Sequence, residues 1–289
     1  MEKQQQNHLK IAKIKSLPTL PEASCNIITA INNPDISIEE LTRVVSTSSA
    51  LSGRLLGLAN SAYFGWPGKI EDLRLAIIQV LGLNLVKGLA VSILVSNEFD
   101  VSRCSRFNGE QFWTQGLLTA TLAQKLATQI NDEKLSPSAL YSAGLLLNIG
   151  LLAVVYAFPD ELNQVFAKVQ ENDSLLSDEI VEAIGESPFQ IGYLLLKRWR
   201  LPAIFPMVLQ QYGQLEFQEQ EEVIKMTNLL KFCSKLAKDI YFNEDQEQPV
   251  SVDVIDQFDL IPAKVQKVVD ELSKKRDSIK DLAISMTGK

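Results

Sequence analysis

The chain has 289 residues, of which 46% are hydrophobic and 22% are charged, and its net charge is −7. This composition excludes an intrinsically disordered chain, and the length suits one large or two modest domains. Basic and acidic residues number 9 and 9 in residues 1–100, 8 and 11 in 101–200, and 11 and 15 in 201–289. Since no region is basic, we expect no nucleic-acid partner.

Helical periodicity dominates residues 1–100, and strand patterns are weak. Ser37 followed by Glu40 is a capping box that predicts a helix start, and Ser48 is expected to cap the next helix. Gly82 is the predicted end of a helix over 71–82. About five helices joined by short turns are predicted here, so we expect residues 1–100 to form a compact helical bundle.

The polar stretch "DVSRCSRFNG" at 100–109 is predicted to be a linker, and helices resume after it. One predicted helix covers the run 139–158, within which no charge occurs from 135 to 159. Its length would permit a membrane span, but its acidic flank at 160–161 favours a helix buried in a large domain. A last helix is expected near 263–286. We therefore predict a second helical lobe over residues 101–289.

Histidine is the decisive count, because His8 is the only one in the chain. Any mechanism that needs two histidines from one chain is excluded. The three cysteines stand far apart, without metal-ligand spacing and in an odd number, which argues against a disulfide framework and fits a reducing cytoplasm. The polar N-terminus lacks a secretory signal. We expect a cytoplasmic protein with no membrane span, no cofactor and no metal site.

Two stretches hold candidate site residues. The turn "ANSAYFGWPG" crowds Asn60, Tyr63, Phe64 and Trp66, whose aromatic rings either anchor a partner or fold back to cap the bundle. Asn148, in "GLLLNIGLL", is one polar residue in an apolar run. It is either a core group with a hydrogen-bond partner or part of a ligand pocket. A catalytic Ser-His pair would have to use His8, and the sequence has no glycine-rich phosphate loop, so neither pattern supports catalysis.

Much of the chain resembles the HD-related output domain, or HDOD domain, of bacterial signalling proteins. The resemblance spans about residues 15–240 and rests on several motifs taken together. They are "LPTLP", "NNPDIS", "RLLGLANSAYFG", "AIIQVLGLNLVKGLAV", "FWTQGLLTATLAQKLA", "SALYSAGLLLNIGLLAV" and "GYLLLKRWRLPAIFPMVLQQY". It departs from the family at "STSSAL" (46–51), where Asp-Pro often precedes Ala-Leu, although Ser48 can still cap that helix.

The resemblance implies an all-helical fold related to the HD metal-dependent phosphohydrolases, and it implies where their metal ligands would fall. The His-Asp pair is matched by Leu147 and Asn148, and later histidine positions fall near Pro188 and at Tyr212 and Gly213. We name the following residues the vestigial cleft positions: Gln115, Leu147, Asn148, Gln211, Tyr212 and Ser234. None of them is a histidine or a carboxylate, so the resemblance implies a lost metal site.

We therefore predict an all-α protein in which an N-terminal bundle packs on a degenerate HD-like lobe, standing alone without a receiver or kinase domain. The leading hypothesis is a non-enzymatic signalling module that acts through contacts with a partner protein. The alternative is a sensor whose emptied cleft binds a nucleotide or metabolite. A phosphohydrolase with a carboxylate-bound metal is a third hypothesis, and fold ancestry alone would not establish it.

Overall fold

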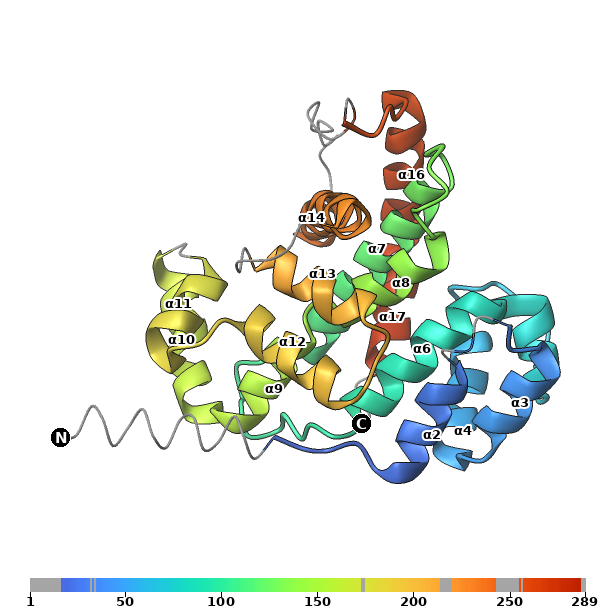
Figure 1. The fold of residues 1–289 in the computed structure, drawn as a ribbon, viewed down its shortest axis with the longest axis horizontal. Helices are drawn as coiled ribbons and strands as arrows, with labels where there is room; N and C mark the ends of the chain where they lie inside the picture. The colour runs from blue at the N-terminus through green and yellow to red at the C-terminus, as the bar shows by residue number, and fades with distance from the viewer. Residues whose placement is uncertain are drawn as a thin grey trace.

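The computed structural model of the protein describes residues 17–31, 33, 35–172, 175–213, 220–242, 255 and 257–286. Within these ranges the regular structure is helical and no strand occurs, which confirms the all-α prediction. Figure 1 shows α2, α3 and α4 gathered on one side, α9 to α13 on the other, and α6, α7 and α17 between them. The division into lobes at residue 100 stays a prediction.

The predicted N-terminal lobe contains α2 (Glu22–Ile31), α3 (Ile38–Ser46), α4 (Ser49–Ala59), α5 (Leu73–Leu75), η1 (Ala76–Leu81) and α6 (Leu83–Ser96). The predicted caps are confirmed, because Ser37 accepts a hydrogen bond from the Glu40 N–H and Ser48 accepts one from the Leu51 N–H. Both contacts satisfy N–H groups that have no partner inside their helix.

The segment predicted as one α-helix over 71–82 is only partly α-helical. It starts as the short α5 and continues as the π-helix η1, whose last turn is closed by the Gly82 N–H donating to the Ile77 carbonyl at 2.8 Å. Gly82 has φ +76°, a left-handed conformation that glycine adopts without strain, and it ends the segment as predicted. Periodicity alone does not reveal the one-residue insertion of a π turn.

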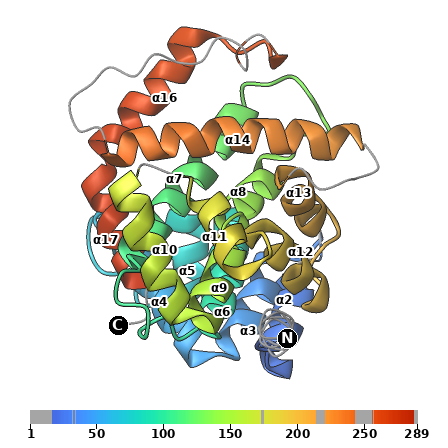
Figure 2. The same cartoon turned by 90° about the vertical axis from the view of Figure 1, so that its left-hand side faces the viewer.

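The C-terminal lobe contains α7 (Gly109–Ala127), α8 (Pro137–Leu146), α9 (Ile149–Ala157), α10 (Pro159–Asn172), α11 (Leu176–Ile184), α12 (Pro188–Arg198), α13 (Ile204–Tyr212), α14 (Glu221–Phe242), α16 (Pro262–Lys274) and α17 (Arg276–Met286). Its centre is α7, which packs against α8, α14, α16 and α17. Figure 2 shows α14 lying across one end of this lobe. The predicted linker before α7 has no regular helix over 100–108.

Two predicted helices are each broken in the structure. The run expected as one helix over 139–158 divides into α8 and α9 at Leu147 and Asn148, and the helix expected near 263–286 divides into α16 and α17 at Lys275. The stretch Pro137–Ala157 is long and apolar enough to cross a membrane, but 72% of its most apolar part is buried inside the protein, as in core helices of soluble proteins.

The break between α8 and α9 is bordered by two helix contacts so close that only glycine fits. A Cβ atom added to Gly144 would lie 2.7 Å from the Ala120 Cα on α7. A Cβ atom added to Gly150 would lie 1.8 Å from the Pro188 carbonyl oxygen on α12. Backbone therefore packs on backbone at both sides of Leu147 and Asn148, and α8 and α9 are held in one position.

We predict that Gly150→Ala destabilises the protein by about 3 kcal/mol, because the new methyl group must push α9 away from α12. The control is Gly57→Ala in α4, where an added Cβ meets no atom within 4 Å. That change should stabilise the helix by about 0.5–1 kcal/mol. Urea unfolding measures both. Equal effects of the two substitutions would contradict the close contact.

A charged cluster joins the turn before α8 to the first turn of α14. Lys225 lies 2.7 Å from both Asp132 and Glu221, and Lys134 lies 2.7 Å from Glu221. Hydrogen bonds from Lys134 and Lys225 are the largest cause of the lowered pKa of Glu221, which falls to about 2 from its ordinary 4.5. The folded state therefore favours the ionised carboxylate.

We predict that this cluster makes stability depend on pH between about 4.5 and 2. Because the folded pKa of Glu221 is depressed, its contribution is present above 4.5 and is lost as the pH falls toward 2. Glu221→Gln should therefore lose less stability between pH 7 and pH 3 than the unchanged chain, as measured by urea unfolding at both pH values. The neighbouring Glu222→Gln is the control, and an identical loss in all three proteins would contradict the prediction.

Candidate functional site

The vestigial cleft positions lie on helices that pack against one another. Gln115 is on α7, Leu147 and Asn148 form the break between α8 and α9, Gln211 and Tyr212 end α13, and Ser234 is on α14. Helix α7 packs on α8 and α14, and α13 packs on α14 and α8. The structure thus places these positions on neighbouring elements, although they are up to 119 residues apart in the sequence.

The pair at the helix break carries little chemistry. Leu147 is 1% exposed and sits in the apolar core. Asn148 is half-buried, precedes α9 with φ −100°, and makes no side-chain capping hydrogen bond. An aliphatic group and a neutral amide cannot replace the imidazole and carboxylate that hold a catalytic metal.

Among the vestigial cleft positions, Tyr212 packs against another aromatic ring. Its ring stacks at 4.8 Å from the Phe189 ring, and the Lys231 ammonium lies 5.5 Å from the Tyr212 centroid. Burial raises the pKa of Tyr212, and a hydrogen bond with the Ser234 side chain partly opposes that rise. Tyr212 and Ser234 are therefore brought together, and Tyr212 is a neutral packed phenol.

The remaining implied histidine position, near Pro188, is occupied by helix packing. The Pro188 carbonyl oxygen faces Gly150 at a distance that leaves no room for a Cβ atom. Within the part of the chain that the structure describes, no three His, Cys, Asp or Glu side chains gather in a way that could hold a metal ion. His8 lies outside the described residues.

Asn60 holds the aromatic turn in place. Its side-chain amide donates to the carbonyls of Leu56 and Ile70, and its side-chain oxygen accepts from the Ile70 N–H, each at 2.8 Å. Asn60 thus ties the end of α4 to the far end of the turn. Asn60 therefore has a structural task, and its role in contact with a partner stays a prediction.

The aromatic side chains of the turn differ in their surroundings. Tyr63 and Phe64 meet edge to face at 4.8 Å and pack against the core, and the Lys275 ammonium lies 5.6 Å from the Tyr63 centroid. Burial raises the pKa of Tyr63. Trp66, by contrast, is 38% exposed. The turn therefore seals the bundle with two rings and presents one to solvent.

We predict unequal stability effects at the two ends of this turn. Asn60→Ala removes three hydrogen bonds and should cost about 1–3 kcal/mol, whereas Trp66→Ala should change stability by less than about 0.5 kcal/mol. Thermal unfolding of the two variants measures the difference. A larger loss for Trp66→Ala would show that its ring packs into the bundle.

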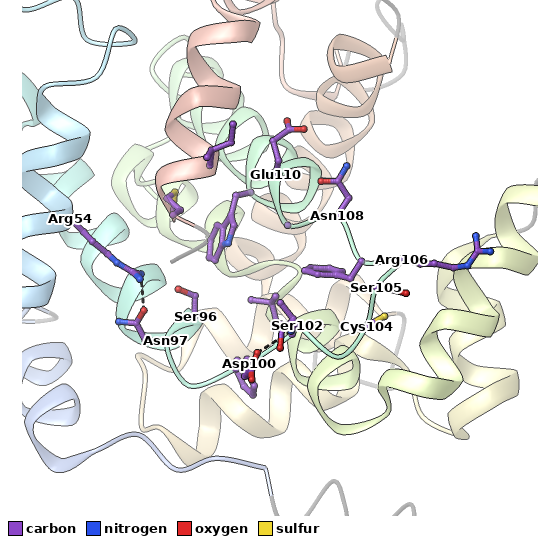
Figure 3. A pocket seen from close by; sticks show the side chains of 18 residues that line it. Arg54, Ser96, Asn97, Asp100, Ser102, Cys104, Ser105, Arg106, Asn108 and Glu110 are labelled. Atoms are coloured by element: carbon purple, nitrogen blue, oxygen red, sulfur yellow. Dashed lines mark hydrogen bonds between the residues drawn. The ribbon is translucent and has the colours of Figure 1, made fainter. Parts of the chain in front are cut away.

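A cavity of about 840 Å³ lies where the two predicted lobes meet. Figure 3 shows the linker following one side of it, with Arg54 and Asn97 on another. None of the vestigial cleft positions lines this cavity or the smaller one beside Tyr63. The sequence did not predict the larger cavity, because its walls come from α4, α6, α7, α9, α17 and the linker. Of these segments, only the linker stood out in the sequence, as a polar stretch.

Comparisons with known proteins agree on the family. The family model for the HDOD domain matches residues 17–214. A Treponema pallidum (strain Nichols) protein, named only as uncharacterized, is 30% identical over 193 residues, which are 66% of this chain and 36% of that protein. This chain thus matches just over a third of the length of that relative.

Solved structures share the fold. A protein provisionally named as a signal transduction protein, from Marinobacter aquaeolei VT8, has a TM-score of 0.78 at 21% identity, covering 98% of this chain and 66% of the other. An HDOD domain protein with unknown function from Geobacter sulfurreducens has a TM-score of 0.71 at 20% identity over 98% of both chains. A provisionally named phosphohydrolase from Shewanella amazonensis SB2B has a TM-score of 0.72 at 21% identity, covering 96% and 98%. With its HDOD match over most of its length and its helical fold, the chain belongs to the HDOD family.

Proposed function

We propose that this HDOD protein is a non-catalytic regulatory module that acts through contacts with a signalling partner. The observation that carries the proposal is the break at Leu147 and Asn148, where the resemblance to the HD phosphohydrolases implies a His-Asp pair. Leu147 is 1% exposed in the core and offers no lone pair to a metal. The scaffold of the superfamily is kept while its reactive groups are replaced.

Metal-dependent phosphohydrolysis needs an ion that generates hydroxide and offsets phosphate charge. In the HD arrangement, histidine and aspartate converge on that ion from several helices. Here the corresponding positions are Gln115 on α7, Asn148 at the break before α9 and Ser234 on α14. Helices α9 and α12 meet backbone to backbone at Gly150. This replacement favours a regulatory role over the hydrolase hypothesis.

Exposed apolar side chains on the N-terminal lobe support a role in protein contacts. Trp66 is 38% exposed, and Leu75 and Ile78, three positions apart, are 42% and 45% exposed. Large apolar groups on a surface are the usual anchors of protein interfaces. The name of the Marinobacter aquaeolei neighbour adds support for a signalling role. We place the module in the cytoplasm, consistent with its three free cysteines.

The hydrolase hypothesis is tested by assaying the purified full chain on nucleotides and a phosphodiester with Mg²⁺, Mn²⁺ or Fe²⁺. We expect no turnover above that of Asn148→Ala, because Asn148 has no catalytic task. Turnover that disappears in Asn148→Ala but survives in the surface variant Asn33→Ala would overturn the proposal.

Contact with a partner is tested by photo-crosslinking in cells that make the protein, with the reactive group at position 66 or 78. We expect the same discrete protein adduct from both positions and none from the control position Lys267 on α16. Adducts that are equally abundant at all three positions, or absent from all, would contradict a contact surface on the N-terminal lobe.

A further inference from the structure

We propose that the cavity between the lobes binds a small organic anion with an apolar or aromatic body and one carboxylate or phosphate group. The cavity is distinct from the vestigial cleft positions, and the proposal does not rest on the regulatory role, since either a catalytic or a non-catalytic chain could hold such a ligand. Its volume of about 840 Å³ is in the range of pockets for small molecules, which also prefer domain interfaces.

Both lobes and the linker build the walls of the cavity. The N-terminal lobe supplies Arg54 from α4 and Asn97 after α6, and the C-terminal lobe supplies Trp113 from α7 and Leu152 from α9. Helix α17 closes one side with Ile284 and Met286. A ligand here would touch segments from six parts of the chain.

Arg54 provides an uncompensated positive charge. Its guanidinium donates one hydrogen bond, at 2.7 Å, to the neutral side-chain oxygen of Asn97, as Figure 3 shows. Among the residues that the structure describes, no carboxylate forms an ion pair with Arg54. The guanidinium keeps further N–H donors in the planar arrangement that suits a carboxylate or a phosphate.

Trp113 provides a second donor from the buried side of the cavity. Its side chain is 3% exposed and lines the cavity, and its indole N–H has no acceptor among the described residues. The indole N–H is not among the fully buried atoms of the described residues, so it can donate to a ligand oxygen in the cavity, and that hydrogen bond would add affinity. Arg54 and Trp113 are independent observations, and both require an acceptor on the ligand.

The carboxylates of the cavity wall are already engaged with protein donors. Glu110 accepts from the Thr114 hydroxyl at 2.9 Å and from the Tyr241 hydroxyl at 3.2 Å. Asp100 accepts from the Ser102 N–H at 3.0 Å. Figure 3 shows Glu110 well apart from the pair of Arg54 and Asn97. The anionic group is therefore expected at Arg54 and Asn97 rather than beside Glu110.

The rest of the cavity wall suits the body of the ligand. It includes the half-buried Phe107 and Val101 from the linker, together with Leu152, Ile284 and Met286. Apolar walls with a few placed donors are the usual composition of a small-molecule site. Because the bound molecule would join both lobes to the linker, its binding would stabilise the arrangement described here.

The test is calorimetric titration of the full chain with paired probes: nucleoside monophosphates against nucleosides, indole-3-acetate against indole-3-ethanol, and inorganic phosphate alone. We expect at least one anionic organic probe to bind at least tenfold more tightly than its neutral partner. The two organic families distinguish a phosphate from a carboxylate ligand, and phosphate alone should bind weakly because it lacks the apolar body.

Variants assign the binding to this cavity. Arg54→Gln and Trp113→Phe should each weaken the anionic probe about tenfold, whereas Arg103→Gln should leave it unchanged, because Arg103 is an exposed linker arginine outside the cavity wall. Circular dichroism verifies that each variant is folded. The proposal is overturned if no anionic probe binds at about 1 mM, or if Arg54→Gln and Arg103→Gln bind alike. Hydrolysis of a probe would count against the regulatory role while leaving the binding site intact.

Discussion

The contact between the backbones of α9 and α12 is the constraint on which the arrangement of the C-terminal lobe depends. At Gly150, an added Cβ atom would lie 1.8 Å from the Pro188 carbonyl oxygen, and Gly144 makes a similar approach to Ala120 on α7. These two contacts hold the break at Leu147 and Asn148 from both sides. The position to which the resemblance assigns the HD metal ligands is here an interior joint between helices, which is why we propose a regulatory rather than a catalytic role.

Space for a ligand lies elsewhere, along the linker between the lobes. The lobes touch where α6 packs on α8 and where α17 reaches α4, and the linker passes beside the cavity that these elements leave open. Arg54 and Trp113 face this cavity from different lobes, so occupation of the cavity and the relative position of the lobes are physically linked. That linkage would let a regulatory module respond to a small molecule without turning it over.

Local signals in the sequence predicted local structure well. Ser37, Ser48 and Gly82 act within one helical turn, and the structure confirms all three. The breaks at Leu147 and Lys275 were missed because apolar periodicity continues through both, and tertiary packing decides them. The vestigial cleft positions came only from the family resemblance, and the cavity was not predictable, because Arg54, Trp113 and Ile284 meet through the fold rather than through spacing.

The central claim, that the metal-binding chemistry of the HD arrangement has been replaced, is tested most directly by elemental analysis of the purified full chain. The protein would be made in medium supplemented with iron, manganese and zinc and then passed through a desalting column. We expect well below one metal ion per chain, with the same value in Asn148→Ala. One tightly held ion per chain that is lost in Asn148→Ala would contradict the account, because it would show that the helix break still serves as a metal site.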